Sequence, residues 1–250
     1  LRRGDCQHAC RAGADARLSP LARQFDGQLP RLVMFDLDGT LLDSVPDLAA
    51  AIDLMLEQLD RESAGIERVR DWVGNGSLVL VRRALAGDIE HAAVDAAEAA
   101  AAHQRFLQIY ADCHALSRIY PGVLECLDWL RAQGIALGLI SNKPFRFIGP
   151  LLTAHGLDGY FQWVLGGDSL AQQKPDPTPL FWMLEQADFV TDQALFIGDS
   201  RSDVLAARAA GVPCIAVGYG YNHGRPIAEE SPLLVLDDLR QLVDSLQGLG

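Results

Sequence analysis

Four short segments of the sequence carry the side-chain types that enzymes use for nucleophilic attack, proton transfer and anion binding. The first contains two carboxylates, Asp36 and Asp38, two positions apart at the end of an apolar run. In an extended chain this spacing places both side chains on the same side, facing one reaction centre. Gly39 and Thr40 then allow a sharp turn and offer N–H groups and a hydroxyl to an anion. A turn that caps a helix would look the same, so the other segments decide between the two interpretations.

The second and third segments add hydroxyl, amide and ammonium groups. Ser141 and Asn142, followed by Lys143, come directly after another apolar run. Lys174 stands beside prolines that fix the backbone, so that its side chain can be aimed reproducibly. Lys143 and Lys174 are the only lysines in the chain, and all other basic residues except histidine are arginines. We therefore interpret Lys174 as a functional cation rather than a solvated surface charge.

The fourth segment supplies a second pair of carboxylates. Asp199 follows an apolar run, Ser200 comes next, and Asp203 stands one helical turn after Asp199. Such a pair suits a hard cation, and Mg²⁺ takes octahedral oxygen ligands while usually keeping several waters. Two carboxylates, a backbone carbonyl and a substrate oxygen would therefore hold it. The alternative is that Asp199 and Asp203 only cap the next helix.

These segments need a framework that positions them, and the apolar runs predict one. Each run is short enough for a buried parallel strand. The runs span residues 31–36, 135–140, 194–197, 213–217 and 233–236. Amphipathic segments such as 123–133 and 203–210 lie between them, which predicts an α/β fold with a doubly wound parallel sheet and a Rossmann-like core. Open sheets of this kind bind ligands beyond the carboxyl ends of their strands, where the four segments would meet.

One interval breaks the alternation of strands and helices. Residues 45–118 contain no convincing strand and predict a helical cap inserted after the first strand. Apolar positions in residues 47–59 recur at the spacing of one helix face, and the alanine-rich segment 92–110 has high helix propensity. The core would then consist of residues 30–44 and 119–250.

Three further stretches are interpreted as loops or as an extension. Two glycines indicate a loop over residues 70–76, between the two helices of the cap. The glycines of residues 218–224 favour a turn after the strand at 213–217 rather than a lining of the site. Residues 1–29 contain no apolar block long enough for a secretory signal, and we predict a disordered extension outside the fold. An arginine-rich transit peptide is the alternative.

Length, charge and cysteine usage exclude several classes of protein. A chain of 250 residues fits one domain, or a core with one inserted module. The formal net charge of -12 opposes binding to nucleic acid. Five scattered cysteines without a paired spacing suggest neither a zinc site nor a disulfide framework, and no apolar stretch reaches the ~18 residues of a membrane helix. We predict a cytoplasmic monomer or homodimer without nucleic-acid or membrane partners.

With the four segments in this order, the sequence resembles the haloacid dehalogenase superfamily. The match runs from residue 31 to about residue 239 and is specific because all four spacings occur together. The resemblance implies an α/β core with a helical cap after the first strand. Within that superfamily Asp38 points to phosphate esters, because dehalogenases do not need a second carboxylate to protonate an alkoxide. A phosphonate hydrolase would need a cap lysine, which residues 45–118 do not contain.

The resemblance also implies a mechanism and a role for each site residue. Asp36 would be the nucleophile that forms an aspartyl phosphate, and Asp38 the general acid and base. The metal would be Mg²⁺, held by Asp36, the carbonyl of Asp38 and Asp199. The residues expected to bind phosphate are Gly39, Thr40, Ser141, Asn142 and Lys174, and those expected behind the metal ligands are Ser200 and Asp203.

Three segments, residues 46–48, 72–76 and 218–224, resemble bacterial phosphoglycolate phosphatases in particular. On that basis we predict a small phosphorylated metabolite as partner, with hydrolysis of 2-phosphoglycolate to glycolate and phosphate. The carboxylate end of this substrate would be read by cap residues, with Arg70, Trp72 and Asn75 as candidates and Arg82 and Arg83 as further arginines. The alternatives are a sugar-phosphate phosphatase, a phosphomutase, or a binding protein that kept the fold without activity.

Overall fold

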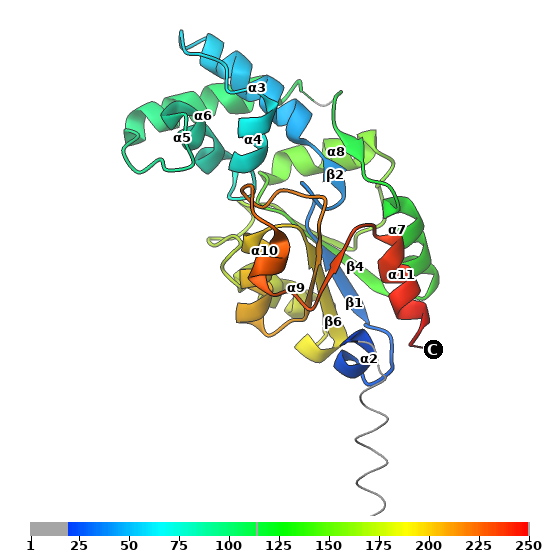
Figure 1. The fold of residues 1–250 in the computed structure, drawn as a ribbon. Helices are drawn as coiled ribbons and strands as arrows, with labels where there is room; N and C mark the ends of the chain where they lie inside the picture. Colours follow the sequence, from blue (N-terminus) through cyan, green and yellow to red (C-terminus); the bar gives the residue numbers. More distant parts are fainter. Residues whose placement is uncertain (1–19, 114, 250) are drawn as a thin grey trace, which may run out of the picture.

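Six strands of the computed structural model form one parallel sheet in the order β5-β4-β1-β6-β7-β8 (Figure 1). The structure describes residues 20–113 and 115–249. The strands are β1 (Leu32–Phe35), β4 (Ala136–Ile140), β5 (Trp163–Leu165), β6 (Ala194–Gly198), β7 (Cys214–Val217) and β8 (Leu234–Leu236). Five of them coincide with the five apolar runs of the sequence, and the predicted α/β class is confirmed. The three-residue β5 was not predicted.

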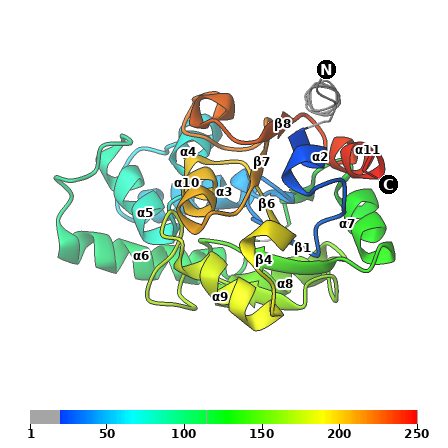
Figure 2. The ribbon, with the colours of Figure 1, turned by 90° about the horizontal axis from the view of Figure 1, so that it is seen from below.

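Helices cover both faces of the sheet because its central strands are apolar on both sides. In β1, Val33 and Phe35 belong to one hydrophobic cluster, whereas Leu32 and Met34 belong to another on the opposite face. Figure 2 shows the two helical layers on either side of the sheet. The first layer contains α2 (Pro20–Gln24), α7 (Val123–Ala132), α8 (Ile148–Ala154) and α11 (Arg240–Gln247). The second contains α9 (Thr178–Ala187) and α10 (Arg201–Ala210).

Four helices form a separate group above the carboxyl ends of the strands (Figure 1). They are α3 (Val45–Glu57), α4 (Ile66–Trp72), α5 (Ser77–Ala86) and α6 (Ala96–Tyr110). α3 packs against α4 and α6, and α5 packs against α6. Their apolar faces share one cluster, which includes Trp72, Phe106 and Tyr110 and also takes in Phe147 and Tyr221 from outside the group. We refer to this group as the cap; its boundaries as a domain stay a prediction.

The sequence predicted two helices in the cap, and the structure adds two that were not predicted, α4 and α5. Two further details also differ from expectation. The predicted loop over residues 70–76 begins only at residue 73, because Arg70 and Trp72 are in the last turn of α4. The alanine-rich helix begins at Ala96 rather than residue 92, because the carboxylate of Asp95 accepts hydrogen bonds from the first free N–H groups and caps α6.

The chain enters and leaves the cap at one place. The short strand β2 (Leu42–Asp43) pairs with β3 (Arg118–Ile119) in antiparallel fashion, with Leu42 opposite Ile119. This two-stranded ribbon lies between the large sheet and the cap, so both connections to the cap run side by side.

The prediction that residues 1–29 form a disordered extension is wrong for its last third, residues 20–29. Residues 20–24 form α2, and Leu21 and Phe25 are buried in the same cluster as β1. Residues 1–19 lie outside the described part of the chain.

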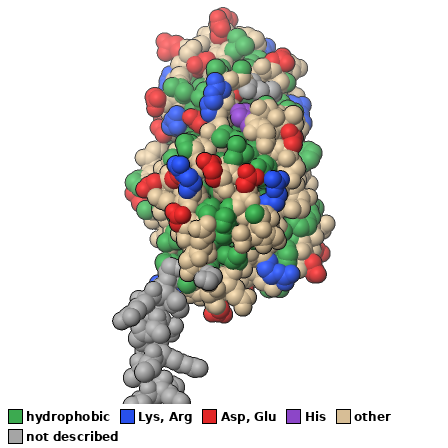
Figure 3. All heavy atoms as spheres, turned by 90° about the vertical axis from the view of Figure 1, so that its right-hand side faces the viewer, with side chains coloured by type: hydrophobic (Ala, Val, Ile, Leu, Met, Phe, Trp, Pro, Cys, Tyr) green, Lys and Arg blue, Asp and Glu red, His purple; other side chains and the backbone are tan. Residues whose placement is uncertain are grey.

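The described residues include no helix that is both long and apolar enough to span a bilayer. On the face that carries α7 and α11, basic and acidic side chains are interspersed without a continuous basic area (Figure 3). This face therefore lacks the continuous basic area that binding to the phosphates of nucleic acid requires.

Candidate active site

Two strand ends position the reactive carboxylates. Asp36 directly follows β1, and Asp199 directly follows the neighbouring strand β6. The main-chain N–H of Asp36 donates to the carbonyl of Ile197, which continues the pairing of the two strands to this point. β4 and then β5 lie on one side of β1 in the sheet. β6, β7 and β8 follow one another on the other side of β1. The carboxylates therefore lie at the switch point, where open α/β sheets bind ligands.

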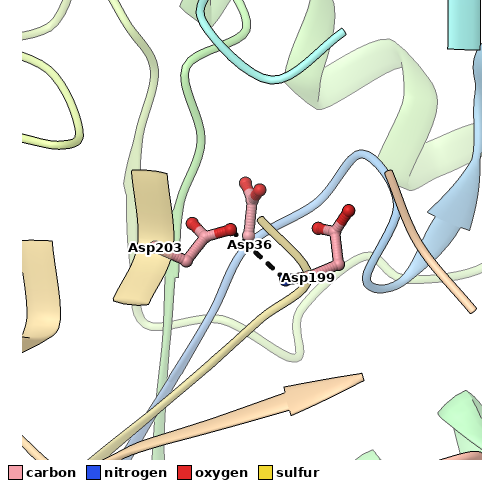
Figure 4. Close-up of side chains that lie close together, drawn as sticks. All are labelled: Asp36, Asp199 and Asp203. Carbon is pink, nitrogen blue, oxygen red and sulfur yellow. Dashed lines mark hydrogen bonds between the residues drawn. The ribbon is translucent and has the colours of Figure 1, made fainter. Parts of the chain in front are cut away.

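Three buried carboxylates meet at this switch point: Asp36, Asp199 and Asp203 (Figure 4). One oxygen from each lies within 4.8 Å of the others. Burial raises the pKa of Asp36 to about 7, with Lys174 opposing the rise and Asp203 and Asp38 adding to it. Burial also raises the pKa of Asp199 well above its usual value, and Asp203 and Asp36 add to the rise. The cluster holds more negative charge than its surroundings neutralise.

Lys174 lies against two of these carboxylates. Its Nζ is 2.9 Å from Oδ1 of Asp36 and 2.7 Å from Oδ1 of Asp203, and the side chain is only 1% exposed. Burial alone would lower the pKa of Lys174, but the charges of Asp203 and Asp36 raise it. The lysine is therefore a fixed positive charge beside the nucleophile predicted from the sequence.

The acidic cluster fits the Mg²⁺ that the sequence predicts. Carboxylate oxygens are the ligands that this cation prefers. The contact between Lys174 and Asp36 is an ion pair without hydrogen-bond geometry, so the buried Oδ1 of Asp36 accepts no hydrogen bond from the described residues. Lys174 supplies only one positive charge to three buried carboxylates, and a divalent cation would supply the charge that is still missing.

The two carboxylate oxygens of Asp203 accept hydrogen bonds from different partners. Its Oδ2 accepts hydrogen bonds from the N–H groups of Asp199 and Ser200 at 3.2 and 3.0 Å, and from Oγ of Ser200 at 2.6 Å. Asp203 thus caps α10, as the alternative interpretation proposed, while its Oδ1 accepts a bond from Lys174. Capping and a place in the acidic cluster are compatible.

Asp38 faces a second lysine that the sequence analysis did not include among the site residues. Nζ of Lys143 lies 2.9 and 3.0 Å from its two carboxylate oxygens, and Oγ of Ser44 donates to Oδ1 at 2.5 Å. The ammonium of Lys143 also lies 4.9 Å from the ring centre of Tyr110. The rarity of lysine in the sequence was the available signal, because both lysines of the chain are buried beside Asp36 and Asp38.

The turn after Asp38 supports Asp199 instead of offering its N–H groups to an anion. The N–H groups of Gly39 and Thr40 donate to the carbonyls of Leu42 and Leu37, and Oγ1 of Thr40 donates to Asp199 at 2.8 Å. Gly39 has φ 89°, and a Cβ there would lie 2.2 Å from Oδ2 of Asp199. These contacts give no support to phosphate binding by the N–H groups of Gly39 and Thr40.

The loop after β7 was expected to be a simple turn, but it borders the site. The N–H of Tyr221 donates to Oδ2 of Asp199 at 2.6 Å. A Cβ on Gly220 would lie 2.2 Å from that of Asp199, so this position admits only glycine. Tyr221 therefore holds Asp199 at Oδ2, whereas Thr40 holds it at Oδ1.

Ser141 and Asn142 follow β4 and lie beside the same centre. Oγ of Ser141 accepts the N–H of Lys143 at 3.2 Å, so its own proton is available to an anion. Nδ2 of Asn142 donates to the carbonyl of Gly74 in the cap loop at 3.1 Å and to that of Lys174 at 2.8 Å. Asn142 thus links the two lysine-bearing loops to the cap.

A cavity of about 40 Å³ lies between these strand ends and the cap. Asp36, Asp38 and Lys143 form part of its floor. Its other lining residues are Ser141, Asn142 and Pro144 from the core segment 141–144, Phe147 at the start of α8, and Leu48, Val73, Gly74, Gly76, Ser77, Leu80, Phe106 and Tyr110 from the cap. The space holds a few water-sized groups.

The cap residues proposed from the sequence do not line this cavity. The guanidinium of Arg70 lies 5.4 Å from the ring centre of Tyr221, Trp72 is buried within the cap, and the amide of Asn75 donates to Oγ of Ser202 at 3.0 Å. Arg82 and Arg83 donate to main-chain carbonyls inside the cap, at Val94 and Trp72 respectively. These side chains therefore stabilise the cap and its contact with the core instead of lining the cavity.

Several known proteins are similar to this chain over most of its length. The family model described as haloacid dehalogenase-like hydrolase matches residues 33–217. Phosphoglycolate phosphatase from Pseudomonas fluorescens strain Pf0-1 is 60% identical over 226 residues, which cover 90% of this chain and 83% of that protein. Phosphoglycolate phosphatase 1 from Pseudomonas aeruginosa is 59% identical, with coverage of 88% and 80%. A crystal structure of a predicted phosphoglycolate phosphatase from Haemophilus somnus gives a TM-score of 0.81 at 37% identity, covering 88% of this chain and 97% of that one.

Proposed function

The chain belongs to the haloacid dehalogenase-like hydrolases, and on that premise we propose that it hydrolyses 2-phosphoglycolate to glycolate and phosphate in the presence of Mg²⁺. The resemblance inferred from the four segments is confirmed by the family match and by the relatives described above. The observation that carries the substrate is the 60% identity to a phosphoglycolate phosphatase over most of both chains. The largely apolar cap side of the cavity offers few partners to the hydroxyl groups of a sugar phosphate.

The first half-reaction uses Asp36 and Asp38. A carboxylate oxygen of Asp36 attacks phosphorus, the ester P–O bond breaks, and the released glycolate oxygen takes a proton from Asp38. Lys174 holds positive charge beside the attacking carboxylate, and the hydroxyl of Ser141 is placed to donate to a phosphoryl oxygen. Mg²⁺ held by Asp36, Asp199 and the carbonyl of Asp38 would offset the negative charge of the phosphoryl group.

The second half-reaction regenerates the enzyme. A water molecule attacks phosphorus in the aspartyl phosphate, Asp38 accepts its proton, and the bond from phosphorus to the Asp36 oxygen breaks. Lys143 and Ser44 hold Asp38 in one orientation through both steps. The cap lies above the centre, and its apolar side chains would limit access of bulk water.

The substrate is tested by measuring phosphate release with Mg²⁺ from 2-phosphoglycolate, hexose phosphates and 4-nitrophenyl phosphate. We expect kcat/KM for 2-phosphoglycolate to exceed that for each hexose phosphate by at least about 100-fold, because the largely apolar cap side of the cavity leaves the hydroxyl groups of a hexose without partners. Equal values across the panel would contradict the proposed substrate and leave the phosphatase chemistry standing.

Mg²⁺ should stabilise the protein as well as activate it. At a concentration 100-fold above its Kd, the cation should raise Tm by about 5–10 °C, since binding to the folded state alone contributes about 2.7 kcal/mol. Asp199→Asn removes one ligand and should abolish most of the shift. Differential scanning calorimetry with Mg²⁺, and with Na⁺ at equal ionic strength, measures it. An equal Tm in both salts would contradict a metal site at this cluster.

Asp38→Asn should separate substrates by the acidity of their leaving groups. With 2-phosphoglycolate, whose leaving alkoxide needs a proton, kcat should fall by about 10²- to 10⁴-fold. With 4-nitrophenyl phosphate the leaving group needs no proton, so a stopped-flow trace should show a burst of about one nitrophenolate per enzyme, followed by slow hydrolysis of the aspartyl phosphate. Equal loss of the burst and of 2-phosphoglycolate turnover would contradict the role of Asp38 as general acid.

A further inference from the structure

The cavity between core and cap has one cationic side chain among the described residues that line it. The cap side is largely apolar, with Leu48, Leu80 and Phe106 among the lining side chains, and the floor holds Asp36 and Asp38. The single cation is Lys143. A substrate with an anionic group on its non-reacting end would have to place that group against this lysine, because charge in an apolar cavity needs a partner.

Lys143 can bind a second anion in addition to Asp38. Its side chain is only 3% exposed, and its Nζ lies 2.9 and 3.0 Å from the two oxygens of Asp38. An ammonium has three N–H donors, which here face the carboxylate of Asp38 and the hydroxyl of Tyr110, and a substrate carboxylate would take the place of the neutral hydroxyl. The ring of Tyr110, 4.9 Å away, provides a further surface that favours a cation. The lysine is thus held charged and fixed at the cavity wall.

The position of Lys143 matches the position of a carboxylate on the leaving group. In the proposed reaction Asp38 protonates the leaving oxygen, so that oxygen must lie within hydrogen-bond reach of its carboxylate. Lys143 is 2.9 Å from the same carboxylate. A group separated from the leaving oxygen by a single carbon therefore comes within reach of its ammonium. In 2-phosphoglycolate that group is the carboxylate.

We propose that Lys143 binds the carboxylate of the substrate and thereby selects phosphate esters of 2-hydroxy acids, an inference that rests on the proposed function. The arginines of the cap do not compete for this role. Arg70 lies over Tyr221, and Arg82 and Arg83 donate to main-chain carbonyls within the cap.

Because negative charge is in excess in the site, binding of a substrate carboxylate should depend strongly on Lys143. Four carboxylates, Asp36, Asp38, Asp199 and Asp203, surround the centre with only two ammonium groups, Lys143 and Lys174. Lys174 is paired with Asp36 and Asp203 at the phosphate end. A carboxylate on the leaving group adds a further negative charge to this centre, where the acidic cluster repels it unless Lys143 binds it. An uncharged leaving group feels no such repulsion and gains little from the lysine.

The test compares two substrates of nearly equal size, 2-phosphoglycolate and its neutral amide, in the wild type and in Lys143→Met. Both esters need a proton on the leaving oxygen, so both report equally on Asp38. In the wild type we expect kcat/KM to favour the carboxylate. In Lys143→Met the value for 2-phosphoglycolate should fall by about 10- to 100-fold more than the value for the amide, as for loss of a charged hydrogen bond. Lys143→Arg, which keeps the charge, should retain part of the preference.

Two results would overturn the assignment. If both esters lose the same factor in Lys143→Met while 4-nitrophenyl phosphate gives the burst expected of Asp38→Asn, the lysine acts only by positioning Asp38. If the wild type hydrolyses both esters equally, the enzyme does not read the carboxylate at all. Hydrolysis of neither ester by the wild type is a different outcome, which contradicts the proposed function itself.

A second measurement covers the case in which Lys143→Met does not fold. Lys143→Gln can still donate a hydrogen bond to Asp38 but carries no charge, and the same contrast between the two esters is expected. In the wild type with Mg²⁺, glycolate should inhibit hydrolysis of 4-nitrophenyl phosphate at a lower concentration than glycolamide. Equal inhibition by the two would contradict a cationic carboxylate site.

Discussion

Asp36→Asn should lower kcat for 2-phosphoglycolate by about 10⁴-fold or more, the loss typical of a removed nucleophile. Asparagine keeps the size of the side chain, so the loss reports on the attacking oxygen rather than on shape. The variant should stay folded, because Asp36 is a buried carboxylate whose pKa is raised to about 7 by burial, and replacing it removes unfavourable negative charge from the cluster. Steady-state phosphate release and circular dichroism measure the two effects.

Trapping the intermediate makes this prediction specific. Wild-type enzyme quenched in acid during turnover of ³²P-labelled substrate should retain label that hydroxylamine removes, as expected of an acyl phosphate, and Asp36→Asn should retain none. The control is Asp244→Asn, the same change on an exposed position of α11. It should match the wild type in both assays. Substantial turnover by Asp36→Asn would contradict covalent catalysis by this residue.

Lys174→Met should reduce both activity and stability, each for its own reason. The ammonium is the positive charge nearest the nucleophile, and loss of such a group from a buried centre lowers kcat by about 10²- to 10³-fold. Its removal also leaves Asp203 buried without its ionic partner, and breaking a buried pair in this way costs about 3–5 kcal/mol of unfolding free energy. Phosphate release and denaturation in urea measure the two losses.

A double variant separates the two roles of Lys174. Lys174→Met combined with Asp203→Asn removes the unpaired charge, so unfolding free energy should recover by a large part of the loss while kcat stays low. Asp203→Asn alone is the matched control, since it removes the carboxylate and keeps the lysine. Recovery of kcat together with stability in the double variant would mean that Lys174 contributes to activity only by supporting the fold.

The parts of the fold that could be predicted from the sequence are those fixed by local patterns. Uninterrupted apolar runs predicted five of the six strands of the sheet. β5 was not predicted because it has only three residues, two of them half-buried, and is too short to give a periodic pattern. The cap helix α4 was missed for a related reason. It has seven residues and ends at Trp72, and the glycines that follow it dominated the interpretation of the segment.

The carboxylates of the site could be predicted because topology determines where parallel strands end. Asp36 and Asp199 follow β1 and β6, which are neighbours, so any parallel sheet with this order brings them together. The partner of each lysine could not be predicted in this way. Lys143 pairs with Asp38 and Lys174 with Asp203, and these choices depend on the course of loops between the strands.

The direction of the cap side chains also depends on packing rather than on pattern. An arginine in a helical cap can extend into the cavity, stack on a ring or bind a carbonyl at similar cost, and the sequence does not distinguish these outcomes. Arg70 stacks on Tyr221, which comes from a loop about 150 residues later in the chain. The same loop holds Asp199 through the N–H of Tyr221. This role was not predicted, because the glycines of the loop favoured its interpretation as a simple turn.

The ribbon of β2 and β3 bears on how the chain folds. β1 pairs with β4 although Leu32 and Ala136 are about 100 residues apart in sequence, and closing a long flexible loop costs entropy before the contact is gained. The pairing of Leu42 with Ile119 brings the two ends of the cap segment together. Once the cap has collapsed and the ribbon has formed, the effective loop between β1 and β4 is a short one. Contact order measured along the bare sequence therefore overstates the barrier that this sheet has to cross.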